Sequence, residues 1–330
     1  MRRPVIRRTA STTLGVDVGG TKIATALVDA GGKILAEHTI PTGAERTAAP
    51  VIADIVACVR ERLGPHARDA VALGVGVAGQ IDPSDGTVLD APNVHWHDVP
   101  LGAELASALG LPVFVTNDVR AATWGEWLHG AGRGAHDLMT LFVGTGVGGG
   151  IVSGGRVLTG CTNTAGEIGH VTIVTGGRQC TCSNRGCLEA YVGGWAIAAQ
   201  AREAAQADQP GGRRLTELAG SVETITAKTV AQAFREGDRL ARRLVDEVGR
   251  HLAAGIVTFV NAFNPCLFIL GGGVIEGVPE LAQMVEGPVR AHALAAATRQ
   301  LRFARAALGN DAGVVGAAAI ARDAVAGHAR

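Results

Sequence analysis

The sequence predicts an α/β protein, because short runs rich in β-branched residues alternate with alanine-rich stretches of helical character. An aromatic content of 4% beside 47 glycines favours a protein with glycine turns and a core of Val, Ala and Leu. The 330 residues are enough for two domains of ordinary size, each with its own core.

Each expected strand is a short apolar run, and each expected helix is a longer stretch that carries apolar residues at helical spacing. The strands are expected at residues 14–18, 23–29, 33–40, 71–77, 113–118, 138–144, 148–154 and 267–272. The helices are expected at residues 48–63, 119–129, 227–236 and 238–262. Residues 203–222 are rich in Gln, Gly, Arg and Thr and are expected to form a surface excursion.

The domain boundary is expected just after Asn117-Asp118, where a strand ends and a helix begins. This gives an N-terminal α/β lobe of residues 14–118 plus about 305–330 and a larger α/β lobe of residues 119–304. Residues 1–13 contain four arginines and no apolar stretch, so a disordered tail is expected there rather than a targeting signal.

Charge and hydropathy exclude two classes of partner. The formal net charge is zero, and apart from the N-terminal arginines the basic residues are scattered, so no nucleic-acid partner is expected. No run approaches the roughly 18 apolar residues of a membrane helix, so no membrane partner is expected. These features predict a cytoplasmic protein.

A short polar stretch, GHVTIVTGGRQCTCSNRGCLEAY at residues 169–191, contains His170, Cys180, Cys182 and Cys187. Its neighbours are Thr, Ser, Asn, Arg and Gly, so packing does not explain the cysteines, and a disulfide would leave one of the three unpaired. Three thiolates and one imidazole would close a tetrahedral shell around zinc. We therefore favour a structural zinc site over a metal-free loop.

Two glycine-rich turns resemble nucleotide motifs without fitting them. GVDVGGTK at residues 15–22 is close to a P-loop and GTGVGG at residues 144–149 satisfies G-x-G-x-x-G, but both lead into a strand where those motifs require a helix. The alternative for each is an ordinary tight hairpin. We interpret them, with the GGG after an apolar strand, as phosphate-binding turns. The residues assigned to the nucleotide are Asp17, Gly19, Gly20, Thr21, Lys22, Gly144, Thr145, Gly146, Gly271, Gly272 and Gly273. Because the carboxylate of Asp17 would repel phosphate, a bridging Mg²⁺ is expected with the nucleotide.

In family order, VDVGGTK, Asn117-Asp118, GTGVGGG, AGEIGH and C-x-C-x4-C-x-E resemble the ROK (repressor, open reading frame, kinase) sugar kinases. The resemblance runs from about residue 14 to residue 322. APNVHWHDVPL and NDVRAATWGEW are similar to segments of bacterial, actinobacterial-type, zinc-containing glucokinases. The resemblance implies an actin-like ATPase fold (ribonuclease H-like, hexokinase-type) with two lobes and a cleft. It also implies Mg-ATP as the donor, a sugar as the substrate and a homo-oligomer, either a dimer or a tetramer.

The strand-to-helix junction carries the candidate base. From the residues alone, Asp118 suits a catalytic base and an N-cap of the following helix equally well. The resemblance favours Asp118 as the general base that activates the 6-hydroxyl of glucose, and Asn117 as a contact to a sugar hydroxyl. Further sugar contacts implied by the resemblance are Gly79, Asn93, Glu167, His170 and Glu189. Of these, Glu167 and Glu189 are expected near the anomeric end, with one ring nitrogen of His170 toward zinc and the other toward the sugar.

Three expectations bear on specificity and on the competing functions. Ser183 and Asn163 stand where the family usually has glycine, so we expect altered loop conformations there that bear on sugar preference. Glucose is favoured over N-acetylglucosamine or N-acetylmannosamine, and polyphosphate remains an alternative donor. The repressors of this family carry an N-terminal helix-turn-helix domain, and only 16 residues precede Asp17, so a sugar-responsive repressor is disfavoured. A sugar-free ATPase is also disfavoured, because it would not need the zinc stretch. Loss of the metal is expected to weaken sugar binding much more than ATP binding, because the nucleotide turns lie elsewhere in the sequence.

Overall fold

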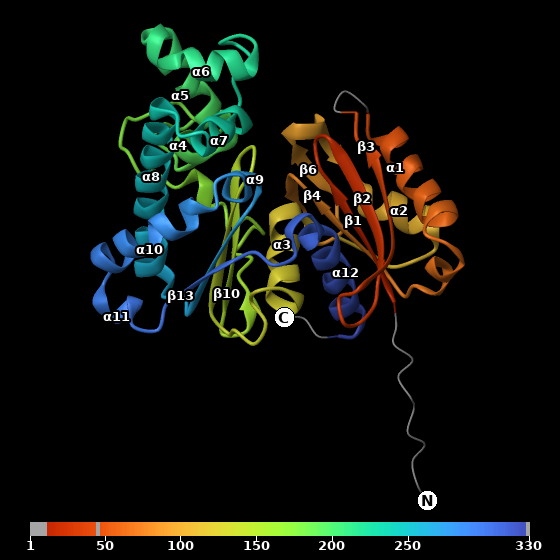
Figure 1. The fold of residues 1–330 in the computed structure, drawn as a ribbon. Helices are drawn as coiled ribbons and strands as arrows, with labels where there is room; N and C mark the ends of the chain where they lie inside the picture. The colour runs from red at the N-terminus through yellow and green to blue at the C-terminus, as the bar shows by residue number, and fades with distance from the viewer. Residues whose placement is uncertain (1–11, 44–46, 328–330) are drawn as a thin grey trace, which may run out of the picture. The chain divides into compact units, whose positions relative to one another are not determined.

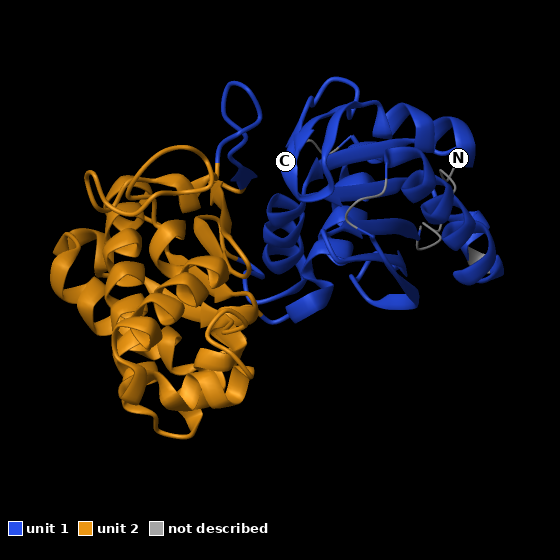
Figure 2. Ribbon diagram, turned by 90° about the horizontal axis from the view of Figure 1, so that it is seen from above, with its two compact units in different colours: residues 1–134, 156–165, 307–330 blue, residues 135–155, 166–306 orange. Residues whose placement is uncertain are grey.

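The computed structural model describes residues 12–43 and 47–327, so the expected tail at residues 1–13 falls almost wholly outside the described residues. The chain divides into two compact units, shown in different colours in Figure 2. Unit 1 comprises residues 1–134, 156–165 and 307–330, and unit 2 comprises residues 135–155 and 166–306. No helix in the described part of the chain combines the length and the apolar character needed to cross a membrane.

Unit 1 is built on a five-stranded sheet in the order β3-β2-β1-β4-β8. The strands are β1 (Thr13–Val18), β2 (Lys22–Val28), β3 (Ile34–Pro41), β4 (Leu73–Val77) and β8 (Val113–Asn117). Strands β1, β4 and β8 are parallel, so their carboxyl ends meet at one edge of the sheet. That edge carries Asp17, Gly79 and the Asn117-Asp118 pair. A small second sheet contains β5 (Gln80–Ile81), β6 (Val88–Ala91) and β7 (Trp96–Val99).

Helices pack on this sheet in Figure 1. They are α1 (Ala48–Ala57), which continues as a π-helical turn at Cys58–Arg62, with α2 (Leu101–Leu109), α3 (Asp118–His129) and α12 (Ala312–Val325). Helix α12 packs against α3, β1 and β4 at glycines. A Cβ at Gly15 would lie 2.0 Å from a backbone oxygen of α12, and one at Gly74 would lie 1.8 Å from another. Glycine at these strand positions is therefore required by the close approach of the helix.

Unit 2 is built on the sheet β11-β10-β9-β12-β13. Its strands are β9 (Leu138–Val143), β10 (Val147–Ser153), β11 (Arg156–Val157), β12 (Leu267–Gly271) and β13 (Arg302–Arg305). The helices are α4 (Glu189–Val192), α5 (Gly194–Ala207), α6 (Gln209–Ala219), α7 (Ala227–Arg235), α8 (Arg239–Phe263), α9 (Gly273–Gly277), α10 (Glu280–His292) and α11 (Ala295–Thr298). Helix α8 buries Leu252, Ile256 and Phe259 in the core of the unit.

The eight predicted strands and four predicted helices are confirmed within a few residues at their ends. The segment 203–222, expected as a surface excursion, lies mostly at the surface, and most of it is helical and belongs to α5 and α6. Asp208 accepts the backbone N–H of Gly211 and so caps α6, and Leu215 buries the inner face of the helix.

Unit 1 extends beyond the expected boundary after Asp118 and includes α3 up to Gly134. The carboxylate of Glu126, on α3, is fully buried. It accepts backbone N–H groups from Ala131, Ala307 and Leu308 at 2.9, 3.0 and 2.7 Å. Through Glu126, α3 binds the segments next to two of the passages of the chain between the units, those after Gly134 and before Ala307, which explains why α3 belongs to unit 1.

Candidate active site

The turn between β1 and β2 in unit 1 is a tight hairpin. The backbone N–H of Gly19 donates to the carbonyl of Lys22 at 3.0 Å, and the hydroxyl of Thr42 donates to the carbonyl of Gly19 at 2.6 Å. A Cβ at Gly20 would lie 3.4 Å from the carbonyl oxygen of Asn93. The predicted nucleotide turn and the predicted sugar contact Asn93 are therefore neighbours.

Asp17 lies on β1 beside this hairpin, and its electrostatic environment is unusual. Burial, followed by the negative charge of Asp118, raises the pKa of its carboxyl to about 7, and the positive charge of Lys22 opposes this rise. Two carboxylates thus lie close enough to repel each other at one sheet edge. Carboxylate oxygens are ligands that Mg²⁺ prefers, so Asp17 fits a divalent cation bound with a phosphate.

The raised pKa of Asp17 predicts a pH-dependent effect of Asp17→Asn on stability. The folded protein holds a proton on Asp17 that the unfolded chain releases near pH 3.8, so the parent loses stability as pH rises from about 4 to about 7. The melting temperature of Asp17→Asn minus that of the parent should therefore increase over this window by on the order of 5 °C and then level off. Calorimetric scans without Mg²⁺ and nucleotide measure it. A difference that stays flat with pH would contradict the assigned ionisation.

Asn117 and Asp118 occupy the junction of β8 and α3. The side-chain oxygen of Asn117 accepts the backbone N–H groups of Val119 and Arg120 at 3.0 and 3.1 Å, and its amide donates to the carbonyl of Gly79 at 3.3 Å. Asn117 is therefore the N-cap of α3. Asp118 lies in the first helical turn, half-buried, where its Oδ1 accepts the N–H of Val119 at 2.9 Å.

In unit 2 the second glycine turn joins β9 to β10 at residues 144–146. It closes with a hydrogen bond from the N–H of Gly144 to the carbonyl of Gly146 at 2.9 Å. The turn borders a cavity of about 1070 Å³ between α5, α7, α8 and α9, large enough for a nucleotide. Gly144, Thr145, Trp195, Lys228 and Gly273 contribute to its lining.

Three of the glycines assigned to the nucleotide have a packing reason for being glycine. A Cβ at Gly271 would lie 2.7 Å from the side chain of Ala306, and Gly272 adopts a positive φ of 90° against the backbone of Val143. At Gly146 the Cβ would meet the carboxylate of Glu189 at 2.5 Å. Neither Gly271 nor Gly272 is among the residues that line the cavity, whereas Gly273 is.

The predicted zinc ligands come together in unit 2. The ligand atoms of His170, Cys180, Cys182 and Cys187 all lie within 4.8 Å of one another. The Sγ atoms of Cys182 and Cys187 are 3.7 Å apart, as are Sγ of Cys180 and Nδ1 of His170. A tetrahedron with zinc–sulfur bonds of 2.3 Å has edges of about 3.8 Å, so the four groups fit zinc. Burial, followed by hydrogen bonds with Cys182 and Cys180, raises the pKa of the Cys187 thiol to about 12, so metal binding must displace its proton.

The two sugar-site glutamates differ in exposure. Glu167 is exposed and precedes the 3₁₀ turn Ile168–His170. Glu189 is only 7% exposed, and it accepts three hydrogen bonds from the protein. Since Nδ1 of His170 faces the thiols, its Nε2 is the nitrogen left to contact a ligand.

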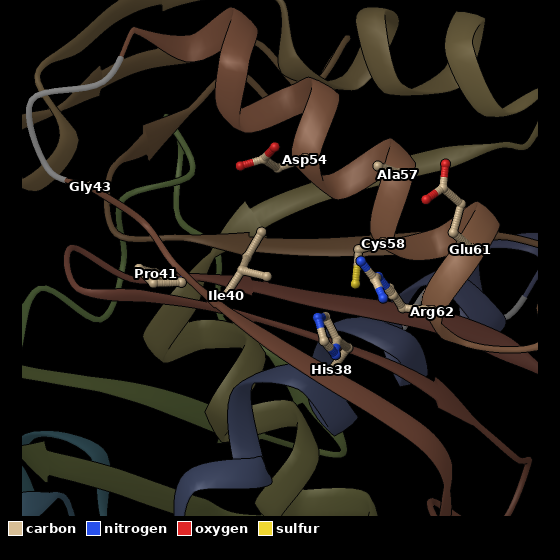
Figure 3. A pocket seen from close by; sticks show the side chains of 9 residues that line it. All are labelled: His38, Ile40, Pro41, Gly43, Asp54, Ala57, Cys58, Glu61 and Arg62. Carbon is tan, nitrogen blue, oxygen red and sulfur yellow. The ribbon is translucent and has the colours of Figure 1, made fainter.

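Other concave or histidine-rich features contain none of the predicted site residues. A cavity of about 440 Å³ lies between β3 and the helical segment 48–62, lined by His38, Cys58 and Arg62 among others (Figure 3). His97 is mostly exposed and forms an ion pair with Asp90 at 2.9 Å. Among the described residues, His170 and the three cysteines form the single group found that could hold a metal ion.

The sequence profile of the ROK family matches residues 13–324. The chain belongs to the ROK family. It is 36% identical to a glucokinase of Streptomyces coelicolor over 94% of this chain and 98% of that protein, and 36% identical to a glucokinase of Thermotoga maritima over 95% and 98%. The crystal structure of a ROK family glucokinase from Streptomyces griseus, in complex with glucose and AMPPNP, superposes with a TM-score of 0.79. That protein is 37% identical, and the alignment covers 95% of this chain and all of that one.

These comparisons confirm the resemblance to ROK glucokinases and the hexokinase-type, actin-like fold class. At the two positions where ROK proteins usually have glycine, the backbone of this chain keeps a positive φ, which glycine adopts readily. Asn163 has a φ of 60° and Ser183 a φ of 69°. Asn is among the residues that tolerate this region, whereas Ser is not favoured there.

Sequence reasoning missed the clamp formed by Arg120. This arginine is 7% exposed, and its guanidinium donates to the side chain and carbonyl of Asn163 and to the carbonyl of Ala165. The amide of Asn163 in turn donates to the carbonyl of Ile81 at 3.1 Å. The segment that leads to Glu167 is therefore fixed through Asn163. The sequence shows an arginine two residues after Asn117-Asp118, but it does not show which residues that arginine contacts.

Restoring glycine at the two departing positions should have opposite effects on stability. Ser183→Gly should raise the free energy of unfolding by about 0.5 kcal/mol, because the gain from relieving a positive φ exceeds the entropy cost of glycine. Asn163→Gly should lower it by about 1–3 kcal/mol, because the buried guanidinium of Arg120 loses an acceptor. Denaturant titrations of both variants and the parent test the contrast. Destabilisation by both to the same extent would contradict it.

Proposed function

We propose that this chain is an ATP-dependent glucokinase, which transfers the γ-phosphoryl group of ATP to the 6-hydroxyl of glucose. The observation that carries the proposal is that this ROK chain contains both groups that phosphoryl transfer to a sugar needs, a candidate base and a candidate nucleotide site. Unit 1 places Asp118 beside Asp17 at one sheet edge, and unit 2 places a glycine hairpin on the wall of a nucleotide-sized cavity. The 36% identity to two glucokinases over more than nine-tenths of the chain supports the same activity.

Asp118 is the proposed general base. Its carboxylate accepts the proton of the attacking hydroxyl, while Asn117 and not Asp118 caps α3. The neighbouring Asp17 would hold Mg²⁺, which neutralises phosphate charge when bound. The β1–β2 hairpin and the β9–β10 hairpin offer backbone N–H groups to phosphate oxygens without side chains in the way.

The proposed glucose contacts are Gly79, Asn93, Asn117, Glu167, His170 and Glu189. A carboxylate offers about four lone-pair sites. The three protein donors on Glu189 therefore leave one acceptor position, on Oε2, for a sugar hydroxyl. A site built from such acceptors rejects analogues that lack the hydroxyl.

Three further properties belong to the same proposal. The Cys/His cluster holds a structural Zn²⁺ with a closed shell, so the metal orients the loop and does not activate water. A cytoplasmic location is part of the proposal. It assembles as a homo-oligomer, a dimer or tetramer, which size-exclusion chromatography with light scattering would measure.

A coupled assay of product formation over a panel of sugars and donors tests the function. Glucose with ATP should give the highest kcat/KM, ahead of N-acetylglucosamine, N-acetylmannosamine and mannose, and ahead of polyphosphate as donor. A preference for an N-acetylhexosamine would keep the kinase and overturn the assignment to glucose. No turnover with any sugar, in protein shown to be folded and loaded with zinc, would overturn the kinase itself.

A further inference from the structure

The carboxylate of Glu189 connects three segments of unit 2 that are distant in sequence. Its Oε2 accepts the backbone N–H of Val147 at 2.8 Å. Its Oε1 accepts the hydroxyl of Thr181 and the indole N–H of Trp195, each at 3.2 Å. Because the glutamate is buried, water competes little for these hydrogen bonds, and an unmet partner would be costly.

The first segment is the glycine hairpin at the nucleotide cavity. A Cβ at Gly146 would lie 2.5 Å from Oε2 of Glu189, so the missing side chain is what lets the hairpin approach the carboxylate. The carbonyls of Gly144 and Thr145 accept N–H groups from the first turn of α5 at 2.9 and 3.1 Å. The hairpin, α5 and Glu189 thus form one hydrogen-bonded assembly, and movement of the glutamate would displace the backbone that lines the cavity.

The second segment is the Cys/His cluster itself. Thr181 lies between Cys180 and Cys182, two of the four proposed zinc ligands. Thr181 is exposed, so packing does not hold its hydroxyl toward Glu189. A metal bound by the cysteines on either side would fix the backbone at Thr181 and with it the direction of the hydroxyl. Trp195, the third partner, lines the nucleotide cavity directly.

We propose that Glu189 is a positioning residue that couples the metal cluster to the nucleotide cavity, so that a bound metal raises the affinity for nucleotide. The coupling runs from Thr181 through the carboxylate to Val147 and Trp195. It rests on the proposed function, because it takes a nucleotide to be the occupant of the cavity. By linkage, nucleotide must raise the affinity for the metal by the same factor.

The test compares Thr181→Val, which keeps the shape of the side chain and removes the hydroxyl, with Thr181→Ser, which keeps the hydroxyl. Calorimetric titration of the zinc-loaded full-length proteins with ADP should show affinity about 5-fold weaker for Thr181→Val, because one hydrogen bond to a buried carboxylate is lost. Thr181→Ser should bind ADP as the parent does. If the shape of the Thr181 side chain mattered and its hydroxyl did not, Thr181→Ser would lose affinity and Thr181→Val would keep it.

A second measurement starts from the parent protein. Zinc affinity of the parent, measured by competition with a chromogenic chelator, should rise about 5-fold when ADP is present, and Thr181→Val should abolish that rise. Equal ADP affinity in the valine and serine variants, or a zinc affinity indifferent to ADP in the parent, overturns the coupling alone. Failure of the zinc-loaded parent to bind ADP at all overturns both the coupling and the proposed kinase.

Discussion

Replacing Asp118 with Asn should lower kcat by about 10²- to 10⁴-fold, the range that a positioned general base contributes. The substitution removes the proton acceptor and keeps the size of the side chain. Folding should survive, because the N-cap of α3 is Asn117 and the amide oxygen of an asparagine at position 118 can still accept the N–H of Val119. ADP affinity should change little, since the cavity is lined by residues of unit 2.

The measurement is turnover in the coupled assay, with a melting curve and an ADP titration on the same sample. Asp246→Asn, at an exposed carboxylate of α8, is the matched control and should keep parental turnover. Because the charge of Asp118 contributes to the raised pKa of Asp17, Asp118→Asn should also lower the pKa of Asp17. Turnover near the parental value would remove Asp118 from the mechanism.

The sequence predicted the parts of the fold that depend on local pattern. The runs LGVDV and LMTLFVG are strands in which nearly all residues are buried, on both faces of the sheet, as apolar runs of this kind predict. The grouping of His170 with the three cysteines could be predicted because ligand chemistry leaves few alternatives. Helix α12 was missed. Its place depends on glycines at positions 15 and 74 that admit a helix backbone, and glycine in a strand does not say what approaches it.

The sequence pointed to candidate site residues but did not reveal all the contacts that these residues make. Asn117 was expected to contact sugar, and its side-chain oxygen is engaged in capping α3. Glu189 was expected near the sugar, and it also binds the glycine hairpin and the loop of the cysteines. The contact of Glu189 with Val147 joins residues 42 positions apart, and spacing along the chain does not encode it. The same holds for Arg120 and Asn163.

Removing one proposed zinc ligand should have the second large effect. Cys182 is the suitable position because it is exposed, so Cys182→Ala leaves no cavity in the core, whereas Cys180 and Cys187 are buried. Zinc content should fall from about one ion per chain to almost none, because the closed shell loses a thiolate. Elemental analysis measures it. Cys161→Ala, at an exposed cysteine outside the cluster, is the control and should keep its zinc.

Ligand affinity in Cys182→Ala then separates two views of the cluster. Glucose affinity should fall about 100-fold, because His170 and the flanking glutamates lose their fixed positions and each hydrogen bond contributes about 1 kcal/mol. The sequence alone predicted a much larger effect on sugar binding than on ATP binding. The contact of Thr181 with Glu189, and of Glu189 with Val147, leads us to expect a loss of about 5-fold for ADP as well. Calorimetric titration with each ligand decides. Stoichiometric zinc in the variant would refute the ligand set, and unchanged glucose affinity in a zinc-free variant would show that the metal does not shape the sugar site.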